Sequence, residues 1–454
     1  MKRLALAHKG IWENGKLGSS IGETGYGRMG DEIENALRNL GYDIEIHAGG
    51  GQILDAAGQP AQLPAAKDTV PATVLAAQLP GHMWGWWEGQ HSVNLCMFES
   101  DTVPVEYADI LHEYETLVVP CEANRIAFAA HHDNIHVVPL GVNPDHWHYT
   151  PRRRVSRRDP FTFLTAGAGW HRKGFDLVIR AFLELRDELN VPMRLIVKAQ
   201  NDLVWDEQPT DPDLHYVKER LTREDEVLLY GRAHCYVSGS RGEGWGLCPH
   251  QAIAQGIPTI LGNGGGQAEF ARFGIPIDTH MTDANYGIWQ DTGQWWEPDY
   301  DHMLAMMRSV FLHYSDYEAQ AKKGAADIAH LTWENTARGL IKVFSDEPPF
   351  KPTGWHTFTR KLYPIMVNRD MRCDVGGVRY VFTPGTVYYQ FSDVKRVIFM
   401  SGALARECPE DGLLPDQCVA FATAKEADCP TCHRPWPSVE DEAQAVLEEL
   451  AAMT

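Results

Sequence analysis

Residues 236–270 read YVSGSRGEGWGLCPHQAIAQGIPTILGNGGGQAEF, and this stretch decides the fold. A short apolar strand ends at Ser238, and a turn with three glycines at 240–246 leads into a helix that begins near Pro249. Glycine permits backbone conformations and close approaches that other residues resist. A helix N-terminus adds unpaired N–H groups and about half a positive charge. The stretch therefore predicts an anion-binding turn, suited to a diphosphate, at the end of a buried strand.

A second glycine turn, at 263–266, follows the next strand and could close over the same ligand. The alternative is a glycine-rich loop that binds nothing, and one turn by itself does not decide between the two. The occurrence of two such turns on neighbouring strands favours a binding site.

Strands and helices alternate on both sides of this stretch. Short apolar runs bounded by turn residues are separated by longer helical patterns, which predicts parallel sheets. The helix at 175–189 is the clearest, because its apolar residues recur at helical spacing. Further helices are expected at 249–255, 315–329 and 333–343, and strands at 4–8, 43–47, 73–78, 93–98, 116–120, 135–139, 161–166, 193–198, 234–238 and 259–261.

The chain divides into two α/β halves and a tail. Residues 141–160, rich in Pro, Arg and Asp, are interpreted as an interdomain linker. This gives one domain over 1–150, completed by a helix near 333–346, and a second over 151–332. Short strands expected at 378–382, 386–390 and 397–400, and an acidic helix at 439–452, predict a separate β-rich appendage over 351–454.

The composition agrees with this division. At about 150 residues per domain, 454 residues predict two to four domains. An apolar fraction of 44% and a charged fraction of 22% exclude wholesale disorder, collagen and coiled coil. No apolar run reaches the roughly 18 residues of a membrane span, and the N-terminus is interpreted as a strand rather than a signal peptide. We expect a cytoplasmic protein, in the host cytoplasm if a phage encodes it.

The net charge of −20 disfavours a general binder of polyanions, because the summed field repels phosphate. Two stretches are nevertheless basic. Residues 152–158 hold five arginines, and residues 351–400 carry eight Lys and Arg against three Asp and Glu. The arginine run is interpreted as a solvated linker or, if it faces the ligand, as a guide for a polyanionic acceptor.

Four ordered motifs resemble retaining glycosyltransferase family 4, whose GT-B fold places two Rossmann-like domains around a cleft. They are EGWGL at 243–247 with its following helix, GWHRKGFDLVIRAF at 169–182, GYGRMG at 25–30, and residues 98–143. Residues 94–143 are most similar to phage-type members. The resemblance covers nearly all of residues 1–346. It implies transfer of a sugar from a nucleoside diphosphate sugar, a UDP-sugar rather than a GDP-sugar, with no cofactor needed. The implied acceptor is a glycan or polysaccharide hydroxyl, or a hydroxymethylated pyrimidine in phage DNA.

Lys173 matches the family's lysine. The departing diphosphate gains negative charge, so stabilising that charge is the main electrostatic task, and Lys173 stands just before Gly174 at a helix start. The alternative is a solvated cation, but a helix N-terminus is an unfavourable place for a cation without an anion nearby. Arg172 is a second candidate, although the family's arginine usually lies further upstream.

Glu243 matches the family's first acidic residue, where a carboxylate favours a cationic transition state; the alternative is a surface glutamate. The family's second glutamate is Gln251 here, which can accept a hydrogen bond from a ribose hydroxyl but lacks the charge. This departure puts the choice of donor in doubt. The implied donor site comprises Gly25, Gly27, Arg172, Lys173, Glu243, Gly244, Trp245, Gly246, Gln251 and Gly265.

Glu99 is the third catalytic candidate, after Glu243 and Lys173. It follows a strand of the first half, where open α/β sheets bind ligands. Asp101 could make the same contact, and a helix N-cap at Ser100 or Asp101 is the structural alternative. The tryptophans at 84–87 and 295–296 could stack on sugars or bases, although aromatic side chains more often pack in the core.

Nine cysteines do not suit a secreted disulfide framework, so most are expected to be free thiols. Cys429 and Cys432 have the two-residue gap of a zinc-binding pair, and with Cys408 and Cys418 they could form a structural zinc site that staples the appendage. Other ligands beside Cys429 and Cys432, or free thiols, are the alternatives. A metal-binding role for Asp211-Pro-Asp213 is disfavoured by its loop context and by the resemblance.

The motifs together predict a glycosyltransferase. Two alternatives stay open, namely a GT-B-type sugar-nucleotide epimerase and a catalytically silent protein that binds a sugar nucleotide.

Overall fold

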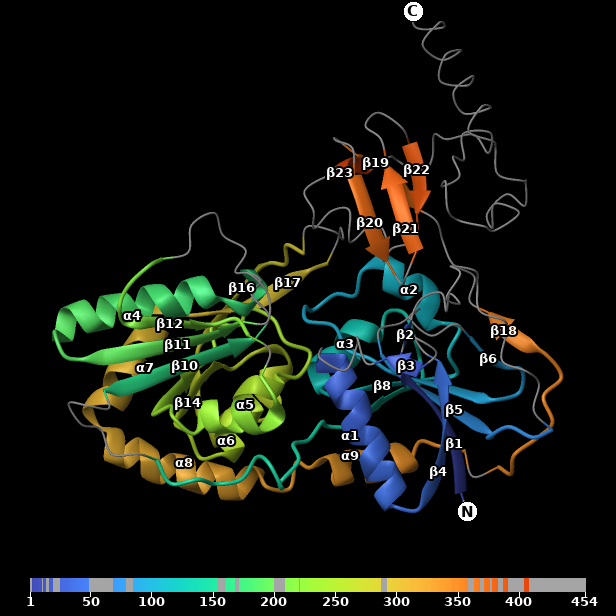
Figure 1. Ribbon diagram of the computed structural model, residues 1–454, viewed down its shortest axis with the longest axis horizontal. Helices are drawn as coiled ribbons and strands as arrows, with labels where there is room; N and C mark the ends of the chain where they lie inside the picture. Colours follow the sequence, from blue (N-terminus) through green and yellow to red (C-terminus); the bar gives the residue numbers. More distant parts are fainter. Residues whose placement is uncertain are drawn as a thin grey trace, which may run out of the picture.

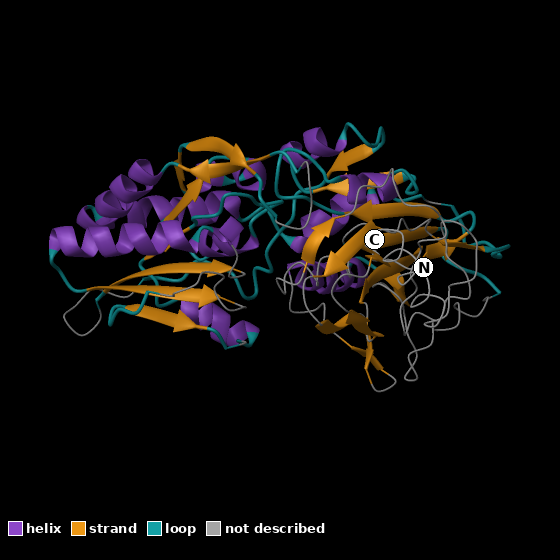
Figure 2. Ribbon diagram, turned by 90° about the horizontal axis from the view of Figure 1, so that it is seen from above, coloured by secondary structure: helices purple, strands orange, loops and turns teal. Residues whose placement is uncertain are grey.

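Two lobes lie side by side in the computed structural model, each built on a six-stranded parallel sheet (Figures 1 and 2). The structure describes residues 2–9, 11–13, 16–18, 25–48, 68–78, 85–152, 160–167, 171–199, 209–219, 221–286, 292–345 and 347–357, and five strands beyond them. The two expected α/β halves with parallel sheets are therefore confirmed.

The sheet of the N-terminal lobe has the order β4-β1-β5-β7-β8-β9. One face is covered by α1 (Gly25–Asn39) and α9 (Trp333–Ile341), and the other by α2 (Val105–Leu111) and α3 (Glu122–Phe128). The strands are β1 (Lys2–Lys9), β4 (Tyr42–Ala48), β5 (Thr73–Ala77), β7 (His91–Leu95), β8 (Thr116–Val119) and β9 (Ile135–Val137).

The sheet of the C-terminal lobe has the order β12-β11-β10-β13-β14-β15. The strand order reverses between β10 and β13, and open sheets of this kind bind ligands at the carboxyl ends of the strands beside the reversal. One face carries α4 (Phe175–Leu189) and α7 (Tyr300–Leu312), and the other carries α5 (Arg223–Tyr230) and α6 (Leu247–Ala254). The strands are β10 (Phe161–Gly167), β11 (Met193–Ala199), β12 (Leu214–Val217), β13 (Cys235–Val237), β14 (Thr259–Gly262) and β15 (Ile275–Ile277).

The chain crosses between the lobes at two adjacent segments. After α8 (Tyr314–Ile328), α9 returns to the N-terminal lobe and packs against α1 (Figure 1). The Thr336 hydroxyl donates a hydrogen bond to the Pro139 carbonyl at 2.8 Å, and Val142 forms an isolated parallel bridge with Thr332. One buried apolar cluster runs through α1, α9, α5 and α6, so the two lobes share a continuous core.

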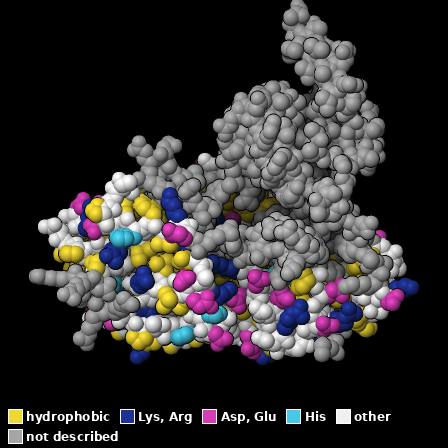
Figure 3. Space-filling model, in the orientation of Figure 1, with side chains coloured by type: hydrophobic (Ala, Val, Ile, Leu, Met, Phe, Trp, Pro, Cys, Tyr) yellow, Lys and Arg dark blue, Asp and Glu magenta, His cyan; other side chains and the backbone are white. Residues whose placement is uncertain are grey.

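Arg152 corrects the interpretation of the arginine run as wholly solvated. Its side chain is buried and donates hydrogen bonds to the carbonyls of Thr150 and Gln255, the latter at 3.0 Å. Gln255 ends α6, so Arg152 binds the linker to the C-terminal end of that helix, where a cation is favourable. Residues 153–158 lie outside the described residues. Basic and acidic side chains are intermixed over the lower part of the face in Figure 3.

Several short strands form two- and three-stranded sheets outside the two large ones. A hairpin of β16 (Thr279–Asp283) and β17 (Gln294–Pro298) extends from the C-terminal lobe, and β2 (Ile11–Glu13) pairs with β3 (Lys16–Gly18). Beyond residue 350, β18 (Trp355–Thr357) pairs with β6 (Gly85–Trp87) of the N-terminal lobe. The other late strands are β19 (Tyr363–Val367), β20 (Met371–Val375), β21 (Val378–Phe382), β22 (Val387–Gln390) and β23 (Leu404–Glu407).

The clearest expectations about secondary structure are confirmed. The helix predicted at 175–189 is α4 without change, and the two late strands predicted at 378–382 and 386–390 are β21 and β22. The expected strand at 397–400 and helix at 439–452 lie outside the described residues. Among the described helices, none has the length and apolar character that a membrane span requires.

Gly174 occupies a position where the fold tolerates no side chain. Its φ is +60°, and a Cβ added there would collide with the carbonyl oxygen of Gly239 in the turn after β13. Because both the left-handed backbone and the close approach exclude a side chain, we expect Gly174→Ala to lower the free energy of unfolding by at least about 2 kcal/mol. Urea denaturation followed by circular dichroism measures this change. Gly25→Ala is the matched control, since nothing lies within 4 Å of a Cβ added there; equal losses in both variants would contradict the prediction.

Candidate functional site

The short helical turn η1 (His171–Lys173) places two cations at the carboxyl end of β10. Gly174 follows it and lets this turn lie directly on the turn after β13, because its backbone packs on Gly239. The stem of Lys173 passes over Gly167, where an added Cβ would stand 3.4 Å from Cδ of the lysine. The Lys173 side chain therefore lies at the carboxyl ends of β10 and β13, where the strand order reverses.

The two glycine turns contact each other and position Glu243. The Gly266 amide donates a hydrogen bond to the Glu243 carbonyl at 2.9 Å, and the Ser240 hydroxyl donates to the Gly242 carbonyl at 3.1 Å. A side chain on Gly266 would collide with the carbonyl of Gly244. The second turn therefore meets the first through a backbone-to-backbone contact that only glycine permits.

Four charged side chains form one network between the lobes. The Lys173 ammonium lies 2.6 Å from Oε1 of Glu243. The Arg172 guanidinium lies 3.7 Å from Oε2 of Glu243 and 3.3 Å from the Glu99 carboxylate of the N-terminal lobe, and it donates to the Gly242 carbonyl at 2.6 Å. The Lys173 and Glu243 side chains are only 16% and 11% exposed, so their attraction is little screened by water.

These contacts set the ionisation of the site. Burial by itself raises the pKa of Glu243, but the charges of Lys173 and Arg172 outweigh it, and the pKa lies below its usual value. Burial lowers the pKa of Arg172, yet Glu99 and Glu243 reverse that effect and raise it. Glu243 is therefore an anion at neutral pH.

Arg241 is a structural part of the site that the sequence analysis missed. Its side chain is 4% exposed and binds both oxygens of Asp176 at 2.8–2.9 Å, Glu297, and the His171 carbonyl at 2.6 Å. It thus ties the turn after β13 to η1, to the start of α4 and to β17. No local pattern in the glycine turn distinguishes this arginine, and only the tertiary contacts reveal its function.

The turn that carries Glu243 also packs against the N-terminal lobe. A side chain on Gly242 would collide with the Glu99 carbonyl, and one on Gly244 would stand 2.5 Å from Cγ of Met97. The Cys121 thiol lies 3.3 Å from the Gly244 carbonyl. The predicted residues Glu99, Gly244, Lys173 and Glu243 are therefore brought together at one place.

The β16–β17 hairpin lies against the glycine turns. The ring of Trp296 packs on Gly265, while Trp295 is 2% exposed and packs against Gly242. Trp295 is thus a core residue rather than a stacking surface. The backbone N–H of Gln294 donates a hydrogen bond to the Asp101 carboxylate at 2.7 Å, so Asp101 anchors the hairpin to the N-terminal lobe.

The remaining predicted donor residues occupy different environments. Trp245 is 2% exposed and donates from its ring nitrogen to His250, so its ring lies in the core. Gly246 has a φ of +101° and begins α6, and Gln251 is buried one turn further along that helix. Gly25 is exposed at the start of α1, whereas Gly27 is buried.

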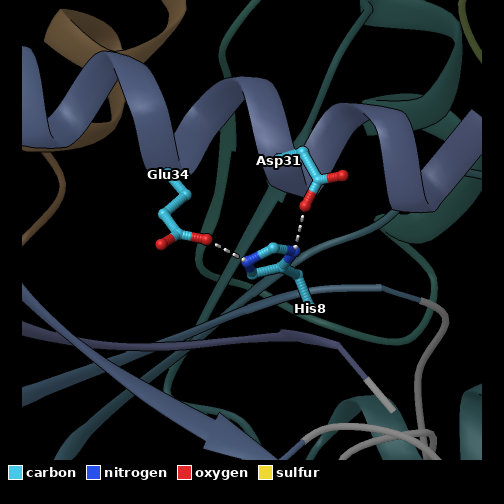
Figure 4. A group of neighbouring side chains, drawn as sticks. All are labelled: His8, Asp31 and Glu34. Atoms are coloured by element: carbon cyan, nitrogen blue, oxygen red, sulfur yellow. Dashed lines mark hydrogen bonds and ion pairs between the residues drawn. The ribbon is translucent and has the colours of Figure 1, made fainter. Parts of the chain in front are cut away.

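A second polar cluster, also missed in the sequence, lies between β1 and α1. The imidazole of His8 is fully buried, with Nε2 at 2.9 Å from Glu34 and Nδ1 at 3.6 Å from Asp31 (Figure 4). The three groups could hold a metal ion, but each ring nitrogen already faces a carboxylate and Glu34 also binds Arg38 at 3.0 Å. Gly30 lets α1 approach the ring closely. The cluster therefore fixes α1 on its strand.

The sequence raises two further questions of metal binding, one at Asp211 and Asp213 and one at the late cysteines. Asp211 and Asp213 bind Arg186 at 2.5 and 3.3 Å, which accounts for the acidic pair without an ion. Cys96, Cys121, Cys235 and Cys248 are free thiols. The proposed zinc ligands lie outside the described residues; they are Cys408, Cys418, Cys429 and Cys432.

Proteins of known family resemble the chain in sequence. Residues 122–340 match the family described as Family 4 Glycosyltransferase in conflict systems. A candidate glycosyltransferase of Acidianus filamentous virus 1 (isolate United States/Yellowstone) is 27% identical over 208 residues, which span 42% of this chain and 61% of that protein. Another, from Sulfolobus islandicus filamentous virus (isolate Iceland/Hveragerdi), is 21% identical over 290 residues, which span 61% of this chain and 77% of that protein.

Solved structures share the fold. One from E. coli, described as trehalose-6-phosphate bound with UDP-2-fluoro glucose, has a TM-score of 0.52 and 12% identity and covers 77% of this chain and 100% of that chain. An α,α-trehalose-phosphate synthase (UDP-forming) from Burkholderia vietnamiensis has a TM-score of 0.51 and 10% identity, covering 76% of this chain and 98% of that chain. At these identities the likeness concerns the fold alone, and it confirms the expected GT-B-like arrangement of the lobes.

The lowered pKa of Glu243 predicts a pH-dependent contribution to stability. A carboxyl whose pKa is lowered by folding stabilises the folded state above its usual value of 4.5, and that contribution is lost as the pH falls through the lowered value. We expect the difference in unfolding free energy between wild type and Glu243→Gln to be largest near pH 7 and to shrink below 4.5. Urea denaturation over this pH range measures it.

Glu334→Gln is the control for this series, because Glu334 is an exposed partner of Arg338 in α9. Its effect should stay within about 0.5 kcal/mol at every pH. A difference for Glu243→Gln that does not vary with pH would contradict the prediction.

Proposed function

Through residues 122–340 the chain belongs to family 4 of the glycosyltransferases, and we propose that it transfers a sugar from a nucleoside diphosphate sugar to an acceptor hydroxyl with retention of configuration. The contact between Lys173 and Glu243 carries this proposal. A cation for the departing diphosphate and a carboxylate for the cationic sugar stand 2.6 Å apart, beside the reversal of strand order.

The chemistry follows from the charges. Breaking the bond between the sugar and the diphosphate leaves negative charge on phosphate and positive charge on the ring. The Lys173 ammonium has three N–H donors, of which Glu243 takes one and two are left for phosphate oxygens. The N-terminus of α6 has no side-chain cap, so its free N–H groups also favour the anion.

Glu243 acts on the sugar. Held as an anion by Lys173 and Arg172, it stabilises the positive charge that develops on the ring as the bond breaks. A departing phosphate oxygen accepts the proton of the acceptor hydroxyl on the same face of the sugar, and the hydroxyl oxygen forms the new bond there. Retention of configuration follows, and no separate protein base is required.

We propose a UDP-sugar as the donor. The E. coli structure with the same fold is described as bound with UDP-2-fluoro glucose, which supports a uridine nucleotide. Gln251 lies on α6, one turn from the helix start, and its amide can accept from a ribose hydroxyl. A thermal-shift panel of UDP, GDP, ADP and dTDP tests the donor, because a nucleotide that binds only the folded protein raises its melting temperature.

The acceptor is proposed to be a hydroxyl of a glycan or polysaccharide, or of a hydroxymethylated pyrimidine in phage DNA. The viral relatives support a viral or phage context, while the net charge of −20 favours a neutral glycan over DNA. Glucosylation assays on hydroxymethylated DNA and on oligosaccharides separate the two.

Removal of either central side chain tests the proposed reaction. We expect Glu243→Ala and Lys173→Ala each to lower turnover by about 100-fold or more, because each removes a charge that acts on the transition state. Nucleotide release from the donor, in the presence of acceptor, measures turnover, and circular dichroism shows whether the fold survives. Lys323→Ala, an exposed position on α8, is the control and should retain wild-type turnover.

Wild-type turnover in both site variants would refute the assignment of the site. Conversion of the donor to an epimer without acceptor would indicate an epimerase instead. Binding of the donor with no conversion would indicate a silent sugar-nucleotide-binding protein.

A further inference from the structure

Lys198 stands at the carboxyl end of β11 with its side chain buried. The residue is 5% exposed, and it pairs in register with Ala166 of β10 and Val217 of β12. Ala166 and Ile196, which point to the same face of the sheet, belong to the apolar cluster that includes α5 and α6. The lysine is therefore directed between the sheet and these two helices, one strand away from β10 and Lys173.

Other cations around this place already have carboxylate partners. Lys173 binds Glu243 at 2.6 Å, and Arg28 of α1 binds Glu226 of α5 at 2.5 Å from the opposite lobe. Arg172 likewise contacts Glu99 and Glu243. In contrast, no hydrogen bond or ion pair joins the Lys198 ammonium to a side chain in the part of the chain that the structure describes, and the charges that act on it from further away include Glu226 and Glu219.

A buried ammonium without a partner is costly, since burial removes the water that stabilised its charge. Burial accordingly lowers the pKa of Lys198, and Glu226 only partly restores it. Its environment is made less favourable by Arg28, which repels it. Burial thus leaves the Lys198 ammonium less stable than it would be in water, and an anionic ligand beside it would stabilise its charge.

The N-terminus of α6 faces the same place. Cys248, in the first turn of α6, interacts electrostatically with Lys173 and Glu243, and also with Lys198 and Glu226. It therefore lies near enough to both lysines to interact with each of them. The helix spans eight residues, and its cap, Gly246, contributes no side chain to its free N–H groups. The start of α6 is therefore within electrostatic range of both ammonium groups.

We propose that Lys198 is a second cation for the diphosphate of the donor, contacting phosphate oxygens on the side of α6 away from Lys173. The inference rests on the proposed function, since it assumes that the donor occupies the ends of β10 and β13. Lys173 then holds the phosphate that leaves the sugar, and Lys198 holds the diphosphate from the other side. The residue is a determinant of donor affinity, and it forms no bond with the sugar.

Binding of inorganic pyrophosphate and of UDP, measured by isothermal titration calorimetry, tests this assignment. Pyrophosphate carries no base or sugar, so its binding reports on the diphosphate contacts alone. We expect Lys198→Met to weaken both ligands by about tenfold or more, because a charge-assisted hydrogen bond is lost. Lys198→Arg should recover much of the affinity, and Lys323→Met, on the exposed face of α8, should bind as wild type does.

The melting temperature of the ligand-free protein separates this role from a structural one. If Lys198 serves a ligand, Lys198→Met removes a charge that burial disfavours, and the ligand-free protein should melt at the same temperature or higher. Unchanged affinity for pyrophosphate and UDP in Lys198→Met would overturn the inference while leaving the proposed function intact. Failure of the wild-type protein to bind any nucleoside diphosphate would instead count against the proposed function itself.

Discussion

The rest of the site depends on the contacts that the Arg172 guanidinium makes with both lobes. It contacts Glu99 of one lobe at 3.3 Å and Glu243 of the other at 3.7 Å, and it donates to the Gly242 carbonyl at 2.6 Å. Its planar fork can hold several acceptors at once in fixed geometry, which an ammonium cannot do. One side chain therefore orients the Glu243 carboxylate, which we propose acts on the sugar, and also fixes that carboxylate relative to the other lobe.

Backbone proximity makes this arrangement possible. Gly174 packs on Gly239, Gly266 packs on Gly244, and Gly242 packs on Glu99, each at a separation that no Cβ would permit. The charged groups consequently meet because of three close backbone contacts, two within the C-terminal lobe and one across the interface. The buried charges in turn need this packing, since a displaced carboxylate would lose the cations that compensate its burial.

Much of this could be predicted from the sequence, for a physical reason. The periodic apolar face of 175–189 and the ordered motifs around Lys173 and Glu243 are local patterns, and local patterns define helices, turns and the ends of strands. Long-range contacts leave no such pattern. Arg241 and Asp101 acquire their partners only when the β16–β17 hairpin folds back, and His8 meets Glu34 only when α1 packs on β1. Trp245 and Trp295 illustrate the same limit, because a tryptophan in a motif looks alike whether its ring is buried or exposed.

The charge of the site also explains why a neutral residue suits position 251. On α6, Gln251 lies three residues after Cys248 and so shares its helix face. The negative charges of Glu226 and Glu243 already act on Cys248 on that face. A further carboxylate there would repel a diphosphate and would compete with it for Lys198. In the proposed donor complex, glutamine keeps an acceptor for a ribose hydroxyl without adding negative charge, and this leaves Lys198 available to the diphosphate.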